Sequence, residues 1–144
     1  MNIREMQIDD LEAVMEIENE CFSVPWTETG FFTFLIRNDT LFLAAEENGM
    51  ILGYAGIVMV PEDGDITNVA VRPDCRKMGV GRAIVTELCA RAKEQGVRHI
   101  FLEVRKSNAA AIALYSGLGF EPIGERKDYY EEPKEDAILM RLEQ

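Results

Sequence analysis

The chain has 144 residues, of which 47% are hydrophobic, and its formal net charge is −11 with a pI near 4.5. This size and composition predict a single domain over residues 1–144, and the acidity argues against a nucleic-acid partner and favours a cationic one such as a basic peptide. No apolar run approaches the roughly 18 residues of a membrane-spanning helix, and the first residues lack the apolar stretch of a signal peptide, so we expect a cytoplasmic protein without a membrane partner.

A strand followed by two helices is predicted at the start of the chain. NIREMQI, residues 2–8, alternates apolar and polar side chains, which is typical of a strand. Asp9 and Glu12 resemble the capping box of a helix whose apolar face contains Leu11, Val14, Met15 and Phe22. Thr27 is a suitable cap for a second apolar helix that runs to about residue 37.

The middle of the chain predicts antiparallel strands. Asn48-Gly49 separates two apolar runs, residues 41–47 and 50–60, and this dipeptide is a strong signal for a two-residue β-hairpin turn. After the turn-like PEDGD, a third β-like run covers residues 66–71 and ends before Pro73. These three runs are expected to pair with one another.

The second half of the chain alternates helix-like and strand-like segments. The expected elements are a helix from Val80 to a stop at Gly96, a strand over 99–105, a helix over 109–118 capped by Ser107-Asn108, and strands over 120–126 and 136–142. This order predicts an α/β fold in which a mixed central β-sheet is flanked by helices on both faces. A crossover is expected within residues 65–105.

RKMGVGR, residues 76–82, stands between the third strand-like run and the following helix. Free amides at a helix N-terminus, the helix dipole and glycine together suit an anion. The neighbourhood is also basic: four cations (Arg72, Arg76, Lys77, Arg82) against one acid (Asp74) give a local balance of +3 in an acidic chain. The segment is therefore a candidate phosphate-binding loop.

The glycine pair by itself has other interpretations. A P-loop is excluded, because GxxxxGK(S/T) is absent. A dinucleotide-binding turn would use Gly79 and Gly81, with Glu103 at roughly the ~20-residue spacing of its acidic residue, but Ile84 occupies the position of the third glycine. A glycine pair that only eases a tight turn also fits the pattern.

A wider set of motifs resembles one known family. NVAV (68–71), the arginine and glycine spacing within 76–82, LEVRKSNAAAIALY (102–115) and Tyr129-Tyr130 follow the order of the GNAT superfamily of acyl-CoA-dependent N-acetyltransferases, whose pyrophosphate loop reads (R/Q)xxGx(G/A). With VPW at 24–26, the likeness covers nearly the whole chain. It is greatest to the branch that acetylates the N-terminus of a small-subunit ribosomal protein, although Glu131 follows the tyrosine pair where that branch tends to have proline and a longer loop.

The resemblance implies acetyl-CoA as the co-substrate, bound in a splay between the strands at 66–71 and 99–105, and no metal. The three scattered cysteines contain no CxxC pair and give no zinc pattern either. A main-chain N–H near Val71 is implied as the oxyanion donor. The implied cofactor-binding residues are Val69, Ala70 and Val71 through their main chain, Arg76, Lys77, Met78, Gly79, Val80, Gly81 and Arg82 at the pyrophosphate, and Asn108, which could equally be a plain helix cap.

Glu103 and Tyr115 are the candidate catalytic residues. Glutamate is unusual inside a strand such as IFLEV, where burial would raise its pKa towards neutrality and suit a general base. The alternative is an ion pair with Arg105 or Lys106. Tyr115 falls on the apolar stripe of its helix, as a core aromatic would, while the resemblance implies that Glu103 is the base and Tyr115 the acid that protonates the departing thiolate.

The implied acceptor is the N-terminal α-amine, with alanine as first residue, of a basic ribosomal protein or peptide. The resemblance implies an aromatic rim around it, formed by Phe22, Pro25, Trp26, Tyr129 and Tyr130, any of which could also be a core residue. Three alternatives stay open: acetylation of lysine side chains or a small amine, a catalytically silent acyl-CoA-binding module, and a dinucleotide-dependent oxidoreductase.

Overall fold

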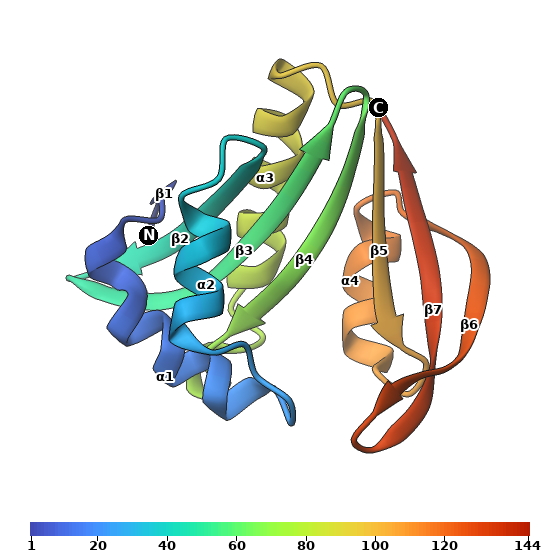
Figure 1. The fold of residues 1–144 in the computed structure, drawn as a ribbon, viewed down its shortest axis with the longest axis horizontal. Coiled ribbons are helices and arrows are strands. Elements are labelled where there is room, and N and C mark those ends of the chain that lie inside the picture. The colour runs from blue at the N-terminus through green and yellow to red at the C-terminus, as the bar shows by residue number, and fades with distance from the viewer.

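A computed structural model describes residues 1–144, which form a seven-stranded mixed β-sheet with four α-helices (Figure 1). The strands are β1 (Asn2–Glu5), β2 (Thr40–Glu47), β3 (Met50–Val60), β4 (Asp63–Val71), β5 (His99–Arg105), β6 (Glu121–Glu131) and β7 (Lys134–Glu143), arranged in the order β1-β2-β3-β4-β5-β7-β6. The helices are α1 (Leu11–Cys21), α2 (Glu28–Leu35), α3 (Val80–Glu94) and α4 (Ala109–Gly117). The predicted element order and the α/β class are confirmed. No helix is long and apolar enough to cross a membrane.

The helices cover both faces of the sheet, as predicted. α1 and α2 pack over β2, β3 and β4 on one face, and α3 packs behind the same strands while α4 lies behind β5 (Figure 1). The buried side chains accordingly fall into two clusters. The larger one surrounds α3 and includes Ile84 and Leu88, and the smaller one lies under α1 and α2 and includes Phe31 and Tyr54.

The sheet divides between β4 and β5. These two strands are the only parallel pair, and they are matched only over Asp63–Asp65 and His99–Phe101. The β3–β4 register shifts so that Gly56 faces Asn68 while Ile57 faces Ile66, which leaves Thr67 as an extra, bulged residue in β4. Beyond this bulge β4 and β5 diverge, and the sheet opens towards the loop that precedes α3 (Figure 1).

The cap of α1 differs from the prediction. Asp9 and Glu12 do not form the capping box, because a short 3-10 turn (Ile8–Asp10) comes before the helix. Asp10 occupies the N-cap position of α1 without a side-chain cap bond. The capping box that does form joins Gln7 and Asp10 around the 3-10 turn, where the Asp10 carboxylate accepts the Gln7 N–H at 2.7 Å. The capping box therefore lies two residues before the predicted one.

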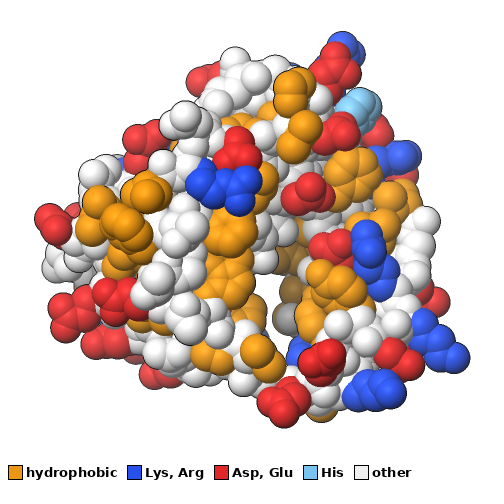
Figure 2. Space-filling view, viewed as in Figure 1, with side chains coloured by type: hydrophobic (Ala, Val, Ile, Leu, Met, Phe, Trp, Pro, Cys, Tyr) orange, Lys and Arg blue, Asp and Glu red, His pale blue; other side chains and the backbone are white.

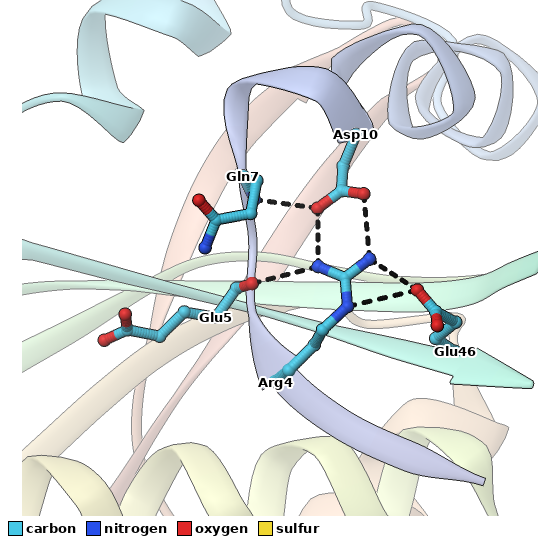
Figure 3. A network of polar contacts seen from close by, with 5 residues as sticks. All are labelled: Arg4, Glu5, Gln7, Asp10 and Glu46. Carbon is cyan, nitrogen blue, oxygen red and sulfur yellow. Dashed lines mark hydrogen bonds and ion pairs between the residues drawn. The ribbon is translucent and has the colours of Figure 1, made fainter. Parts of the chain in front are cut away.

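Asp10 takes this role because Arg4 holds it (Figure 3). The Arg4 guanidinium donates to both oxygens of Asp10, at 2.7 and 2.9 Å, and to Glu46 of β2 at 2.6 Å. The Arg4 hydrogen bonds lower the pKa of Asp10 below its ordinary value. One guanidinium thus joins β1, β2 and the start of α1.

Several strands are longer than predicted. β4 begins at residue 63, inside the expected PEDGD turn, and β6 and β7 extend to a tight connection at residues 132–133. Almost every residue of β6 is exposed, so its sequence carries little of the apolar alternation from which strands are predicted.

Candidate active site

A cavity of about 640 Å³ lies where β4 and β5 diverge, and Figure 2 shows the corresponding hollow in the molecular surface. Its walls come from the C-terminal end of α1 with the segment after it, from β4 and β5, from α4, and from the end of β6 with the β6–β7 connection. The predicted site residues in these walls are Phe22, Trp26, Val69, Glu103, Asn108, Tyr115, Tyr129 and Tyr130. Residues more than a hundred positions apart in sequence are thus brought to one cavity.

The other predicted residues lie outside these walls. Pro25 is half-buried beside the cavity, and the Ala70 side chain is buried in the smaller core cluster, so that only its main chain is available to a ligand. The loop at 76–82 lies at the open end of the splay. A Cβ atom on Gly81 would be 3.5 Å from side-chain atoms of both Val71 and Leu114, so the loop adjoins the end of β4 and the side of α4.

The segment at 76–82, which consists of a loop and the first residues of α3, has an unusual backbone. Lys77 and Gly79 both have positive φ, at 65° and 80°. The first amide of the region that finds a backbone acceptor belongs to Ala83, which donates to the Gly79 carbonyl at 3.0 Å, and the amides of residues 76–82 have no backbone acceptor. Free amides at the N-terminus of the long helix α3 suit a phosphate group.

The neighbouring helix α4 is apolar yet largely uncovered. Only Tyr115 of its residues is buried, while Ala111, Ile112 and Leu114 pack at the margin of the larger core cluster. Asn108 is its N-cap, with its side-chain oxygen accepting the Ala111 N–H at 3.1 Å, and it also lines the cavity. An apolar wall next to free amides suits a ligand with a long uncharged arm and a phosphorylated end.

Glu103 faces the cavity from β5, on the side opposite the buried Leu102 and Val104. The expected burial is only partial, since 26% of its side chain is exposed, and Arg126 of β6 approaches its carboxylate at 3.4 Å. The alternative prediction, that Glu103 pairs with Arg105 or Lys106, is wrong, because Arg105 pairs with Glu135 and Lys106 pairs with Glu125. Glu103 is therefore a half-buried cavity carboxylate that is paired with one half-exposed cation.

Tyr115 faces the same cavity from α4. Its side chain is 7% exposed and packs edge-on against Phe120, with ring centroids 5.8 Å apart. Burial, with a smaller contribution from Tyr130, raises the pKa of Tyr115 above its ordinary value near 10. Its phenol thus remains protonated at neutral pH and can donate a proton or a hydrogen bond into the cavity.

The segment after α1, residues 22–26, forms one side of the predicted acceptor rim. Trp26 stacks on Phe34 with centroids 4.8 Å apart and meets Phe31 edge-on at 5.1 Å, so it is both a core contact and a cavity residue. The Ser23 hydroxyl donates to the Glu132 carbonyl and so connects this segment to the β6–β7 connection.

The opposite side of the rim is held by Arg105. Its guanidinium donates to the carbonyls of Glu132 and Pro133, both at 2.9 Å, and lies over the ring of Tyr130 at 4.3 Å. Burial raises the pKa of Tyr130 to about 12. Tyr129 stands perpendicular to Tyr130 and remains 48% exposed, which leaves an aromatic face open to a ligand.

Sequence reasoning missed several cavity residues, among them Glu18, Ser23 and Asn68, and it missed Arg126, which pairs with Glu103. One of these had a usable signal. Glu18 occurs at helical spacing between Val14 and Phe22, on the apolar face of α1, where a charged residue needs a partner. The others give no such sign, because their positions depend on how distant segments meet.

Comparison with known proteins agrees with this geometry. The chain matches the acetyltransferase (GNAT) family over residues 11–120. It belongs to this family. It is 37% identical over 144 residues to the ribosomal protein bS18-alanine N-acetyltransferase of Escherichia coli K12, a match that covers 97% of this chain and 95% of that protein. The corresponding protein of Salmonella typhimurium LT2 is 38% identical over 136 residues, covering 92% and 90%.

The fold also matches that of a solved acetyltransferase structure. The crystal structure of the ribosomal-protein-S18-alanine N-acetyltransferase from Escherichia coli superposes with a TM-score of 0.91 at 36% identity, covering 99% of this chain and 92% of that one. The chain is thus a GNAT acetyltransferase whose acetyl donor is acetyl-CoA. The free amides at 76–82 and the uncovered apolar side of α4 fit the phosphates and the pantetheine arm of that donor.

Proposed function

We propose that the protein acetylates the N-terminal α-amine of a ribosomal protein whose first residue is alanine, the reaction for which its Escherichia coli and Salmonella typhimurium relatives are named. The observation that carries this proposal is the shared cavity, which Glu103 of β5 and Tyr115 of α4 both line and whose entrance is surrounded by aromatic residues. The relatives named for this reaction match nearly the full length of the chain. A ribosomal acceptor would make the cytoplasm the site of reaction.

The donor lies along β4 in this proposal. The amides of Arg76, Lys77, Met78, Gly79, Val80, Gly81 and Arg82 bind its pyrophosphate, and the main chain of Val69, Ala70 and Val71 runs beside its pantetheine arm, with Asn108 across from it. On the β5 side, β4 has no strand partner beyond Asp65, so main-chain groups of this stretch are available. Bound acetyl-CoA supplies a thioester carbonyl as the electrophile.

The two cavity side chains then divide the proton transfers. Glu103, directly or through a water molecule, accepts a proton from the ammonium or attacking amine, whose nitrogen forms a bond to the thioester carbonyl carbon. A main-chain N–H near Val71 stabilises the oxyanion. As the C–S bond breaks, the departing sulfur receives a proton or hydrogen bond from Tyr115, whose raised pKa keeps its phenol protonated.

The rim suits a short apolar N-terminus followed by cationic residues. Phe22, Trp26, Tyr129 and Tyr130 surround the entrance, with Pro25 beside Trp26. The carboxylate-bearing residues Glu131 and Glu132 also line it, and the whole chain is acidic, so a basic ribosomal peptide is complementary in charge.

Acetyl-CoA turnover against matched peptides tests the proposal. One peptide has a free N-terminal alanine and no lysine, and its counterpart has a blocked N-terminus and one lysine. We expect turnover of the first to exceed that of the second by at least about 100-fold near pH 8, because an α-amine has a pKa of roughly 7.7–8.0 against about 10.4 for lysine. Preference for the lysine peptide would overturn the proposed acceptor, and turnover of neither would overturn the proposed activity on peptides.

A further inference from the structure

Glu18 is the only charged residue of the chain that is buried. It lies near the C-terminal end of α1, its exposed fraction is 2%, and no cation contacts its carboxylate. Burying a carboxylate without a cation costs free energy that an apolar residue of the same size would not cost. The position therefore has a use other than filling space.

Three hydrogen-bond donors surround this carboxylate. Oε2 accepts the backbone N–H of Trp26 at 3.0 Å, and Oε1 accepts the Tyr54 hydroxyl at 2.5 Å and the Asn68 side-chain amide at 3.3 Å. Burial and the bond to Glu18 raise the pKa of Tyr54, so its hydroxyl remains a donor. A group that only accepts hydrogen bonds is matched to donors on all sides.

These donors come from parts of the molecule that must be aligned for acetyl transfer. Trp26 belongs to the rim segment at 22–26, which has no strand or helix to fix it. Asn68 follows the bulged Thr67 of β4, and the Thr67 hydroxyl donates to the Asn68 side-chain oxygen at 2.8 Å. Glu18 therefore connects the acceptor rim directly to the strand along which the donor is proposed to lie.

We propose that Glu18 is a positioning residue: through the Trp26 amide it fixes the acceptor rim relative to β4, so that the rim binds the peptide with its amine at the thioester. This inference rests on the proposed N-terminal acetylation. Glu18 is not itself a base in this scheme, since both of its oxygens are occupied by donors. A displacement of about 1 Å at the rim is enough to lower transfer by as much as about 100-fold.

Glu18→Gln tests the inference with almost no change in shape. The amide can satisfy Trp26 or the Tyr54 and Asn68 pair, but its NH₂ group then faces a donor on the other side. We expect KM for the alanyl peptide to rise about 10- to 100-fold, while Kd for acetyl-CoA stays within twofold. Glu12→Gln is the matched control, because it removes the same charge from an exposed position on the same helix and should change neither quantity.

The single tryptophan of the chain supplies a readout that a purely structural role would not move in the same way. If Glu18 holds Trp26, then Glu18→Gln in the folded protein should make Trp26 fluorescence more accessible to acrylamide. Tyr54→Phe removes one donor but keeps the bond to Trp26, so it should lower the melting temperature and leave the peptide KM within threefold. Tyr54→Phe is thus the control for stability alone. If Glu18→Gln behaved in the same way, with a lower melting temperature and an unchanged peptide KM, the inference would be overturned.

Two further controls keep the result interpretable. Should Glu18→Gln fail to fold, Glu18→Asp keeps the acceptor-only group but is too short to reach all three donors, and the same rise in peptide KM is expected. The wild-type enzyme must transfer acetyl to the alanyl peptide in the same assay. A wild-type enzyme that does not do so contradicts the proposed function, whereas an active wild type with an unchanged peptide KM in folded Glu18→Gln or Glu18→Asp contradicts only the role of Glu18.

Discussion

The two ends of the cavity differ in what they offer a ligand. At the end next to α3, the ligand would contact backbone amides and the apolar side of α4. At the rim, it would contact side chains from three segments that are distant in sequence. The donor end is contained in a short loop and the helices beside it. The acceptor end requires residues 22–26, β5 and the β6–β7 connection to converge, and Glu18, Ser23 and Arg105 hold these segments together.

This difference has a physical consequence for specificity. Backbone amides bind phosphate whatever side chains they carry, so the donor end can stay constant while neighbouring side chains vary. The proposed acceptor rim would instead recognise its ligand through side-chain shape and charge, so a few substitutions there would change the acceptor. Variants at the two ends should therefore change donor affinity and acceptor affinity separately. Variants between the two ends should lower the rate of acetyl transfer.

The largest effect is expected where the ends meet, at Glu103. Glu103→Gln keeps the shape but cannot accept a proton, so kcat/KM for the alanyl peptide should fall by roughly 10² to 10⁴. Acetyl-CoA affinity, measured by calorimetric titration, should change less than twofold, because the phosphate contacts are remote. Steady-state kinetics at saturating acetyl-CoA provide the rate.

Arg126→Gln is the matched control for this variant. Arg126→Gln removes the ion pair between Arg126 Nε and Glu103 Oε1, which are 3.4 Å apart, but leaves the Glu103 carboxylate in place. Because Arg126 is about half exposed, its ion pair contributes little, and the rate should stay within about threefold of wild type. An equal loss of rate in both variants would mean that the ion pair, and not proton acceptance, is what Glu103 provides.

The donor end can be broken separately at Gly81. A Cβ atom at this position meets only ordinary contacts at 3.5 Å, and the φ of Gly81 is not positive, so Gly81→Glu should fold. Its carboxylate would repel the pyrophosphate and block two or so amide contacts, which predicts a rise of about 100-fold or more in Kd for acetyl-CoA. Calorimetric titration measures this value directly.

Gly124→Glu is the control for Gly81→Glu. It places the same charge on the edge strand β6, where a Cβ atom meets nothing within 4 Å. We expect wild-type acetyl-CoA affinity in this variant. Unchanged affinity in a folded Gly81→Glu protein would show instead that the loop at 76–82 is only a turn.

The donor end was also the part that the sequence could predict. The glycine loop, the cap at Asn108 and the helix starts at residues 80 and 109 depend on local signals, and each lies within a residue or two of its predicted place. The capping box before α1 was misplaced, because the pairing of Asp10 with Gln7 depends on Arg4 and its second partner in β2.

The proposed acceptor end was only partly predictable, because it is formed by side chains from segments that are distant in sequence. Its aromatic residues could be named from the family resemblance, but their anchors could not. Glu18 meets partners 36 and 50 positions away, and Glu103 pairs with a β6 arginine instead of its neighbours in β5. A sequence pattern specifies a face of a helix or strand, whereas these contacts depend on the bulge at Thr67 and on the path of an exposed strand.

The smallest effect is expected at Tyr115, which adjoins both ends. Tyr115→Phe preserves the edge-on packing against Phe120 and removes only the hydroxyl, so stability should change little and kcat should fall about tenfold. We expect a modest loss because burial raises the pKa of Tyr115 well above the roughly 8.5 of an ordinary thiol. In the proposed mechanism the phenol would then stabilise the departing sulfur mainly by a hydrogen bond and would transfer its proton only in part.

The pH dependence of kcat distinguishes this role from simple packing. A raised pKa keeps the phenol protonated below about pH 10, the ordinary tyrosine value, so no alkaline decline due to Tyr115 should occur between pH 7 and that limit in the wild type. The tenfold ratio between wild type and Tyr115→Phe should therefore be constant across this window. A ratio that shrinks steadily from pH 7 towards pH 10 would mean that the phenol ionises in the range where activity is measured, and a ratio of one throughout would leave Tyr115 as a core aromatic alone.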